Sequence, residues 1–353
     1  MLLALHEMFP DAPLFTAVYD SEKAPWAKVF PKVIPSFLQK VPFAKGKHEF
    51  LGTFTPLAFE TFNFDEYGLV ISVTSEAAKG IITKPGTLHI CFCLTPTRYL
   101  WSHYDFYFEK PPDMFKVFPF FKYISKPITS YLKAWDKIAA QRPDIMISQS
   151  KEVQKRIKKY YNRDTKIINP PTEIKEFESK KKSAKRKVQE YYLYVSRLIP
   201  YKRPDLAVEA FNELGLPLVV VGSGSEEEKL KKIAKDNVKF VGEVKNSELA
   251  GYYREAKALI FPGEEDFGLV MVEAQAAGVP VVAFRGGGAL DTVIDGETGL
   301  FFDKQTVKSM SRAIVLFNKM SFNREEIVKN AKRFSKERFK REILQLVNES
   351  LKQ

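Results

Sequence analysis

Arg197 and Lys202 are two cations that stand close together after a strand-like run at residues 192–196. An arginine binds phosphate oxygens through a planar fork, and a lysine binds them as a point charge. The two side chains can therefore neutralise a diphosphate together. The alternative is that both are surface cations beside acidic helix ends, with no role in chemistry.

Glu265 and Glu273 are the most informative carboxylates. Glu265 lies in a predicted loop, and Glu273 lies nearly two turns inside the predicted helix that follows. A carboxylate in this apolar stretch is costly unless it has hydrogen-bond donors. A ribose diol offers two donors to one carboxylate, and Glu265, near the positive start of the helix, can accept hydrogen bonds from sugar hydroxyls. The alternative for Glu273 is a residue on the polar face of the helix.

Glycine-rich and polar segments follow the other predicted strands of the second half. Ser196 follows the first strand, Gly222 the second, Gly242 and Glu243 the third, and residues 285–288 the fifth. Glycines let backbone N–H groups approach phosphate oxygens. Because ligands bind beyond the carboxyl ends of strands in open α/β sheets, these segments predict one shared site. No dinucleotide fingerprint or Gly-Lys-Ser/Thr phosphate loop occurs, which argues against P-loop NTPases and nicotinamide enzymes.

The second half alternates apolar β-rich runs with helix-like stretches, as in a parallel sheet covered on both faces. The expected strands are residues 192–196, 217–221, 239–241, 258–261, 280–283 and 300–302, and the expected helices are 204–214, 226–234, 246–256 and 267–277. In the first half we expect strands at 14–19, 69–73, 88–93, 145–148 and 166–168, and helices at 128–140 and 151–161. These patterns predict an α/β fold with two doubly wound domains, residues 1–170 and 171–330. A charged C-terminal helical segment at 331–353 follows.

The net charge of +12 over 353 residues suits an anionic partner such as nucleic acid, a phosphorylated ligand or an anionic membrane. The densest basic run, residues 180–187, has no interleaved aromatic that could stack on bases, so a solvated loop is favoured over a nucleic-acid site. Residues 106–122 mix aromatic and basic side chains, which either lie at a membrane interface or pack in a core.

The cysteines and the hydropathy bear on the location of the chain. Cys91 and Cys93 would form only a strained disulfide, and two unbridged thiols suit a reducing compartment. No apolar run is long enough to cross a bilayer. We therefore expect a cytoplasmic protein. The net charge of +12 and the aromatic and basic residues 106–122 motivate the further hypothesis of peripheral contact at the inner face of the cytoplasmic membrane.

Residues 262–283 carry Glu265 and Glu273 in an arrangement that resembles the Glu-x7-Glu signature of the retaining glycosyltransferases of family 4, which have the GT-B fold. Further matching segments are residues 195–198 with Lys202, 286–288 before Asp291, 296–300 and 334–339. The first half, through residues 67–72, 78–80 and 89–101, resembles a narrower branch. That branch is the mannosyltransferase-like enzymes that assemble bacterial and archaeal surface polysaccharides, lipopolysaccharide among them.

The resemblance implies two Rossmann-like domains facing a cleft, with the C-terminal helix at 331–353 returning to the N-terminal domain. It also implies GDP-mannose as the nucleotide-diphosphate sugar. Arg197 and Lys202 would bind the diphosphate in place of a metal, so neither metal nor cofactor is expected. Glu273 would hold the ribose and Glu265 the donor sugar. Backbone groups near the diphosphate or sugar would come from Phe267, Gly268 and Leu269. The other partner would be a glycan or lipid-linked acceptor, with no role for nucleic acid.

Two departures from the family pattern stand in the first half. Residues 1–10 resemble the helix that follows the first strand and glycine-rich loop of relatives, so the N-terminal domain is expected to lack both. Leu94 stands where many relatives have a histidine, and His89 is better explained as a satisfied strand histidine. Arg98 and Lys79 are the candidates for contacts to the acceptor, and the alternative is that both are ordinary surface cations.

Three other functions remain open at this point. The same fold can use a UDP-sugar, because no side chain here distinguishes guanine from uracil. The second is a protein that binds a nucleotide sugar without transferring it, because the N-terminal domain is expected to lack its first strand and glycine-rich loop. A nucleic-acid binder, favoured by net charge alone, is the third and would bind with steep salt dependence.

Overall fold

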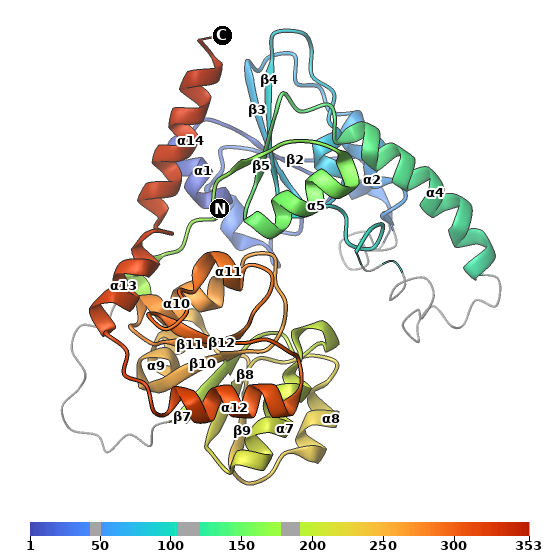
Figure 1. Cartoon of the computed structure of the whole chain (residues 1–353). Coiled ribbons are helices and arrows are strands. Elements are labelled where there is room, and N and C mark those ends of the chain that lie inside the picture. The colour runs from blue at the N-terminus through green and yellow to red at the C-terminus, as the bar shows by residue number, and fades with distance from the viewer. Residues whose placement is uncertain (43–50, 103, 105–120, 178–190, 353) are drawn as a thin grey trace. The chain divides into compact units, whose positions relative to one another are not determined.

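The computed structural model describes residues 1–42, 51–102, 104, 121–177 and 191–352 (Figure 1). The chain divides into two compact units. Unit 1 comprises Met1–Ile168 together with Lys340–Gln353, and unit 2 comprises Asn169–Phe339. The basic run at 180–187 lies outside the described residues, as does the aromatic and basic segment at 106–122 apart from its last two positions.

Unit 2 contains a six-stranded sheet whose neighbouring strands are all parallel. Its strands are β7 (Tyr191–Val195), β8 (Leu218–Val221), β9 (Val238–Gly242), β10 (Ala256–Phe261), β11 (Val281–Phe284) and β12 (Gly299–Phe302). They lie in the order β12-β11-β10-β7-β8-β9. The four residues of β8 are all buried, because a parallel sheet covered on both faces leaves no side of an inner strand in water.

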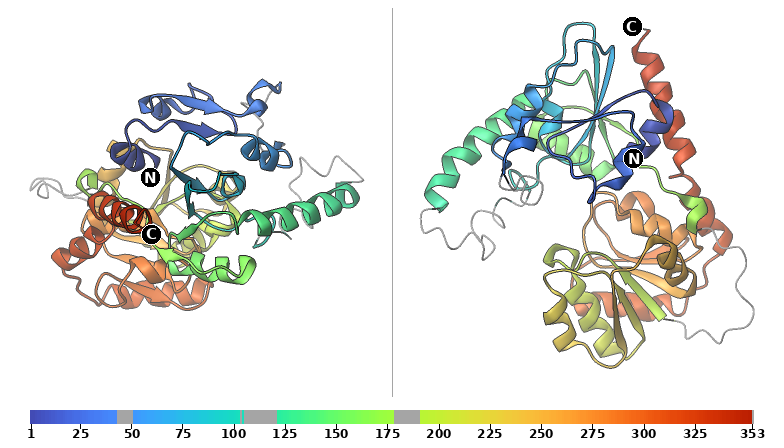
Figure 2. Two further views of the ribbon diagram at one scale, coloured as in Figure 1. Left: turned by 90° about the horizontal axis from the view of Figure 1, so that it is seen from above. Right: turned by 180° about the vertical axis from the view of Figure 1, so that it is seen from behind.

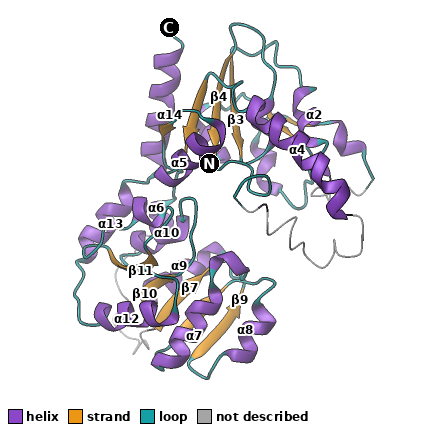
Figure 3. Cartoon of the chain, turned by 45° about the vertical axis from the view of Figure 1, so that its right-hand side comes forward, coloured by secondary structure: helices purple, strands orange, loops and turns teal. Residues whose placement is uncertain are grey.

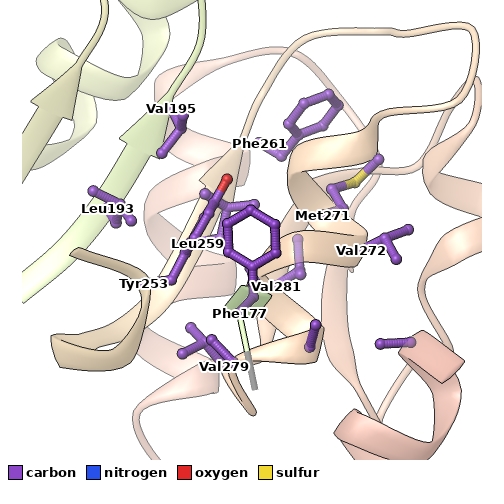
Figure 4. Close-up of a cluster of buried hydrophobic side chains, with 14 of the residues drawn as sticks. Phe177, Leu193, Val195, Tyr253, Leu259, Phe261, Met271, Val272, Val279 and Val281 are labelled. Atoms are coloured by element: carbon purple, nitrogen blue, oxygen red, sulfur yellow. The ribbon is translucent and has the colours of Figure 1, made fainter. Parts of the chain in front are cut away.

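Alternate residues of each strand enter cores on opposite faces of this sheet, since the side-chain period of a strand is two. Leu193 and Val195 pack in one core together with Met271, as Figure 4 shows. Tyr192 and Tyr194 pack in the core on the other face. Helices therefore cover both faces of the sheet (Figure 3).

The helices of unit 2 are α6 (Ile174–Phe177), α7 (Pro204–Leu214), α8 (Glu227–Ile233), α9 (Asn246–Glu255), α10 (Leu269–Ala276), α11 (Ala289–Thr292), α12 (Val307–Phe317) and α13 (Arg324–Lys332), with the 3-10 helix η6 (Pro200–Lys202). Proline in the first turn of α7 and Gly215 at its left-handed C-cap explain why both ends of that helix could be predicted. The strands and helices predicted for the second half are present, with ends that agree within two residues.

Unit 1 contains a four-stranded parallel sheet in the order β3-β4-β5-β6 and a separate parallel pair, β1 and β2. The strands are β1 (Leu14–Thr16), β2 (Val33–Pro35), β3 (Leu69–Thr74), β4 (Leu88–Cys93), β5 (Ile145–Ser148) and β6 (Lys166–Ile167). The α-helices are α1 (Leu2–Met8), α2 (Thr55–Glu60), α4 (Phe121–Ala139) and α5 (Lys151–Tyr161). The 3-10 helices are η1 (Pro25–Val29), η2 (Phe37–Lys40) and η4 (Ala77–Gly80). The long helix α14 (Lys336–Ser350) enters unit 1 at Lys340 and runs past α1 (Figure 2). Near its start, Lys340 Nζ lies 2.8 Å from Glu7 Oε2 on α1.

The predicted α/β class with two parallel-sheet domains is confirmed. Two local predictions for unit 1 differ from the structure in their bounds. The strand expected at 14–19 is present but ends at Thr16, and it pairs with β2, which was not predicted. Helix α4 begins at Phe121 and not at 128, because Pro127 costs the helix one backbone hydrogen bond without ending it. Cys91 and Cys93 are both buried, and within the described residues neither forms a disulfide.

Candidate functional site

The strand order of unit 2 places one point of reversal between β7 and β10. From β7 the chain moves outward through β8 and β9, then returns to the other side of β7 as β10 and moves outward through β11 and β12. The helices that follow these two strands pack on opposite faces, α7 in the core of Tyr192 and α10 in the core of Leu193. The loops after β7 and β10 must therefore diverge, and such a switch point is where open α/β sheets bind ligands.

Lys202 and Glu265 meet at this switch point. Lys202 ends η6 after β7, Glu265 lies in the loop after β10, and the two side chains form an ion pair. Their side chains are 9% and 19% exposed. A Cβ on Gly263 would lie 2.9 Å from the carbonyl oxygen of Lys202, so only glycine lets the two loops come this close. The fold thus brings a cation and a carboxylate from distant segments into one partly enclosed place.

Arg197 follows β7 on the same loop as Lys202, but its side chain is exposed. Its Nη2 lies 3.5 Å from the hydroxyl of Tyr201, at the limit of a hydrogen bond. No carboxylate of the described residues forms an ion pair with it. The guanidinium charge therefore remains available to an anion.

The polar residues predicted at the ends of β7, β8 and β9 lie side by side. The N–H of Gly222 donates to the carbonyl of Gly242 at 2.8 Å, and Gly222 has φ +125. A Cβ on Gly222 would collide with the carbonyl oxygen of Ser196. Glu243 accepts a 2.5 Å hydrogen bond from Ser223 Oγ and is exposed. The structure thus gathers Ser196, Gly222, Gly242 and Glu243 along one edge of the sheet.

The start of α10 is held by the glycines after β11. The N–H of Gly288 donates to the carbonyl of Glu265 at 2.8 Å, and a Cβ on Gly288 would collide with the backbone of Phe267. The Phe267 side chain is buried against Phe334, with ring centroids 5.4 Å apart, so its backbone alone can face a ligand. The helix itself begins after Gly268, at Leu269, which is 41% exposed.

Glu273 lies one turn further along α10 than Leu269, on the same partly exposed side. Its Oε2 accepts a 2.9 Å hydrogen bond from the hydroxyl of Tyr253 on α9. Burial raises the pKa of Glu273, the hydrogen bond from Tyr253 opposes that shift, and Glu176 on α6 adds to it. A carboxylate with a raised pKa and room for further donors is a candidate ligand-binding group. The sequence reasoning missed Tyr253, for which the chain carries no motif.

The two acceptor-side candidates of unit 1, Arg98 and Lys79, differ in burial and in contacts. Arg98 is half-buried in the segment after β4, at the carboxyl edge of its sheet. Lys79 is 1% exposed, so it is not the surface cation that one interpretation expected. Its Nζ lies 2.5 Å from Asp136 Oδ1 and donates to the carbonyl of Glu76 at 2.5 Å. These contacts make Lys79 a structural cation of unit 1 and argue against contact with an acceptor.

His89 is fully buried on β4, with its Nε2 2.9 Å from Ser72 Oγ. Burial lowers its pKa to about 4, so the ring is neutral near pH 7. In the described part of the chain, no cluster of three or more His, Cys, Asp and Glu side chains could hold a metal ion. The helices within that part include none long and apolar enough to cross a membrane.

Three comparisons bear on the family. Residues 175–334 match the family model described as glycosyl transferases group 1. Over 138 residues the chain is 36% identical to the GDP-mannose-dependent alpha-(1-6)-phosphatidylinositol monomannoside mannosyltransferase of Mycobacterium tuberculosis, a match that covers 34% of this chain and 36% of that enzyme. Over 131 residues it is 42% identical to the D-inositol 3-phosphate glycosyltransferase of Acidothermus cellulolyticus, covering 31% and 29%. The chain thus spans about a third of the length of these curated relatives.

Solved structures resemble the chain over most of its length. HepE from Anabaena, in complex with UDP and glucose, has a TM-score of 0.65 at 16% identity, covering 98% of this chain and 94% of that one. Sucrose-phosphate synthase from Thermosynechococcus elongatus has a TM-score of 0.64 at 21% identity, covering 90% and 82%. At these identities the likeness establishes a shared fold, which is GT-B.

Proposed function

Unit 2 belongs to the group 1 glycosyl transferases, and on this premise we propose that the chain is a metal-independent retaining glycosyltransferase. It transfers a sugar from a nucleotide-diphosphate donor to a glycan or lipid-linked acceptor. The observation that carries the proposal is the meeting of Lys202 and Glu265 at the switch point of the sheet, with the exposed Arg197 on the same loop. Two cations and a carboxylate in this place suit a diphosphate joined to a sugar.

The proposed reaction begins when the donor diphosphate binds Arg197 and Lys202. Because Lys202 is already paired with Glu265, the diphosphate competes for the ammonium and releases the carboxylate to the hydroxyls of the donor sugar. The two cations then stabilise the charge on the departing phosphate as the bond to the anomeric carbon breaks. The acceptor hydroxyl attacks from the face that the phosphate leaves and gives its proton to the departing phosphate oxygen. The products are the glycoside, with retained anomeric configuration, and the nucleoside diphosphate.

The ribose of the nucleotide is proposed to bind Glu273, and the backbone of residues 267–269 the diphosphate or donor sugar. Glu273 is a half-buried carboxylate with one donor among the described residues, the Tyr253 hydroxyl. A carboxylate accepts about four hydrogen bonds, so most of its capacity is open to a diol. Arg98 remains a proposed contact to the acceptor, on the carboxyl edge of the unit 1 sheet.

We propose GDP-mannose as the donor and a lipid-linked glycan as the acceptor. The support is the mycobacterial relative, whose name specifies GDP-mannose and a phosphatidylinositol mannoside. HepE, bound to UDP and glucose, supports the alternative of a UDP-sugar, but it shares only the fold. Contact with the inner face of a membrane stays a prediction that follows from the lipid-linked acceptor.

The first test is calorimetric titration of the full chain with GDP, UDP and GDP-mannose, without added metal. We expect selective binding of GDP. Selective binding of UDP would instead indicate that the donor is a UDP-sugar bound at the same site. The variant Glu273→Ala should weaken nucleotide binding about tenfold or more, because it removes hydrogen bonds to a charged acceptor. The exposed Glu325→Ala on α13 serves as the matched control.

Unchanged affinity in Glu273→Ala would remove the ribose assignment. Binding of none of the three nucleotides by the unaltered chain would refute the proposed function. Binding without sugar transfer to any lipid-linked or soluble glycan would favour a nucleotide-sugar-binding protein. Retention is checked by the anomeric configuration of the product.

A further inference from the structure

Tyr253 is a fully buried tyrosine whose hydroxyl has a specific partner. Its exposure is 0%, and its ring packs edge-on against Phe177 with centroids 5.7 Å apart. Figure 4 shows the ring beside β7 and β10, with the hydroxyl toward the carboxyl ends of these strands, which Val195 and Phe261 mark. The hydroxyl therefore points to the edge of the sheet where the candidate site lies, and packing holds it there.

The hydroxyl donates to Oε2 of Glu273 at 2.9 Å. Within the described residues no other group donates to Glu273, so Oε1 and one lone pair of Oε2 are open. These two open acceptor positions suit the two vicinal hydroxyls of a ribose, because each hydroxyl can donate to a different carboxylate oxygen. A glutamate side chain has three rotatable bonds, and a fixed donor on one oxygen reduces the number of orientations that the other oxygen can take.

The same contact favours the charged form of the carboxylate. Burial and the negative charge of Glu176 on α6 raise the pKa of Glu273, whereas the hydrogen bond from Tyr253 lowers it. Removal of the Tyr253 hydroxyl would leave the two effects that raise the pKa of Glu273 and would remove the one that lowers it. The carboxylate would then be worse oriented and more easily protonated.

We propose that Tyr253 is a positioning residue, which orients Glu273 to accept both hydroxyls of the nucleotide's ribose. This inference rests on the proposed function, because it assumes that Glu273 binds the ribose. Tyr253 itself touches no substrate in the proposal, and its effect reaches the ligand through one carboxylate. It explains why a tyrosine hydroxyl lies in an otherwise apolar core beside Phe177 and Leu259.

The test compares Tyr253→Phe with the unaltered full chain in calorimetric titrations. The probes are GDP, or UDP if that is the nucleotide bound, and its 2′,3′-dideoxy analogue. The matched control is Tyr192→Phe, which removes a buried hydroxyl bonded at 2.6 Å to Asn318 on the other face of the same sheet. Tyr253→Phe should weaken binding of the ribonucleotide about tenfold and change binding of the dideoxy analogue less than about twofold. In a Glu273→Gln background the same substitution should have an effect below about twofold.

If Tyr253→Phe lowers the affinities for the ribonucleotide and the dideoxy analogue equally, Tyr253 is merely structural and the inference is overturned. Affinities of Tyr253→Phe that equal those of the unaltered chain would also overturn it. An unaltered chain that binds both nucleotides equally would overturn the ribose role while leaving nucleotide binding intact. Failure of the unaltered chain to bind either nucleotide would instead refute the proposed function, and the inference with it. A loss confined to the ribonucleotide, absent from Tyr192→Phe, would support the assignment.

Discussion

Asp136 on α4 is a buried carboxylate whose replacement by asparagine should destabilise unit 1. Its Oδ1 lies 2.5 Å from Lys79 Nζ and accepts a 2.9 Å hydrogen bond from Thr97 Oγ1. Its Oδ2 accepts hydrogen bonds from Trp101 Nε1 at 2.7 Å and from the hydroxyl of Tyr161 at 2.6 Å. The Lys79 and Asp136 side chains are 1% and 2% exposed. Asp136→Asn would thus remove the counter-charge of a buried ammonium.

The expected loss is about 4 kcal/mol, because breaking a buried ion pair by removing one partner costs about 3–5 kcal/mol. With a urea dependence of about 2 kcal/mol/M for a unit of this size, the unfolding midpoint should fall by about 2 M. Asparagine retains one acceptor oxygen, so the hydrogen bonds are lost only in part. The ion pair therefore accounts for most of the effect.

Tryptophan fluorescence can follow unit 1 alone during urea unfolding. The three tryptophans of the chain, Trp26, Trp101 and Trp135, all lie in unit 1. The matched control is Asp164→Asn. It breaks an exposed pair with Lys158, in which the side chains are 54% and 92% exposed, and should cost less than about 1 kcal/mol.

A midpoint for Asp136→Asn within about 0.5 M of the unaltered chain would refute this reasoning. The double variant Lys79→Met/Asp136→Asn separates charge from packing. Because it removes both members of the pair, it should be more stable than the sum of the two single changes predicts, by about 2 kcal/mol. Additive losses would show that the Lys79 charge is not the cause.

Two further changes test the buried histidine and the close approach of two loops. The pKa of His89 falls from 6.5 to about 4 on folding, so its neutral ring contributes fully above pH 6.5, and that stability is lost as the pH falls toward 4. The stability advantage of the unaltered chain over His89→Gln should shrink by about 2–3 kcal/mol between pH 7 and pH 4.5 in urea unfolding, whereas a constant difference would contradict a buried neutral ring. Gly222→Ala should cost about 1–3 kcal/mol more than Gly215→Ala in thermal unfolding. Both glycines have positive φ, but only at position 222 would a Cβ meet backbone, that of Ser196 and Arg197. Equal costs would contradict the close approach of the two loops.

The six strands of unit 2 and four of its helices could be predicted because each of them reflects local physical chemistry. Runs such as β8 are apolar at every position, and α7 carries a proline at its start and a glycine at its end. Both signals lie within a dozen residues of chain. The Glu265 and Glu273 spacing is equally local, and it led to the same family that residues 175–334 match.

Pairing between distant segments could not be predicted in the same way. The sequence alone left Lys79 open as a surface cation or an acceptor contact, because no local pattern shows that α4 brings Asp136 against it. It placed residues 14–19 in a strand but not in a two-stranded sheet with β2. Tyr253 lies twenty positions from Glu273, on a different helix, and carries no motif.

The sequence by itself determined most of the strands and four of the helices of unit 2, because burial pattern and turn chemistry act over a few residues. It also determined that strand-end residues would meet at one edge, since the carboxyl ends of parallel strands share that edge. Only the tertiary structure decided the strand order, and with it the position of the switch point between β7 and β10. Only the tertiary structure paired Lys202 with Glu265 and Tyr253 with Glu273, because such contacts depend on how helices pack across the finished sheet.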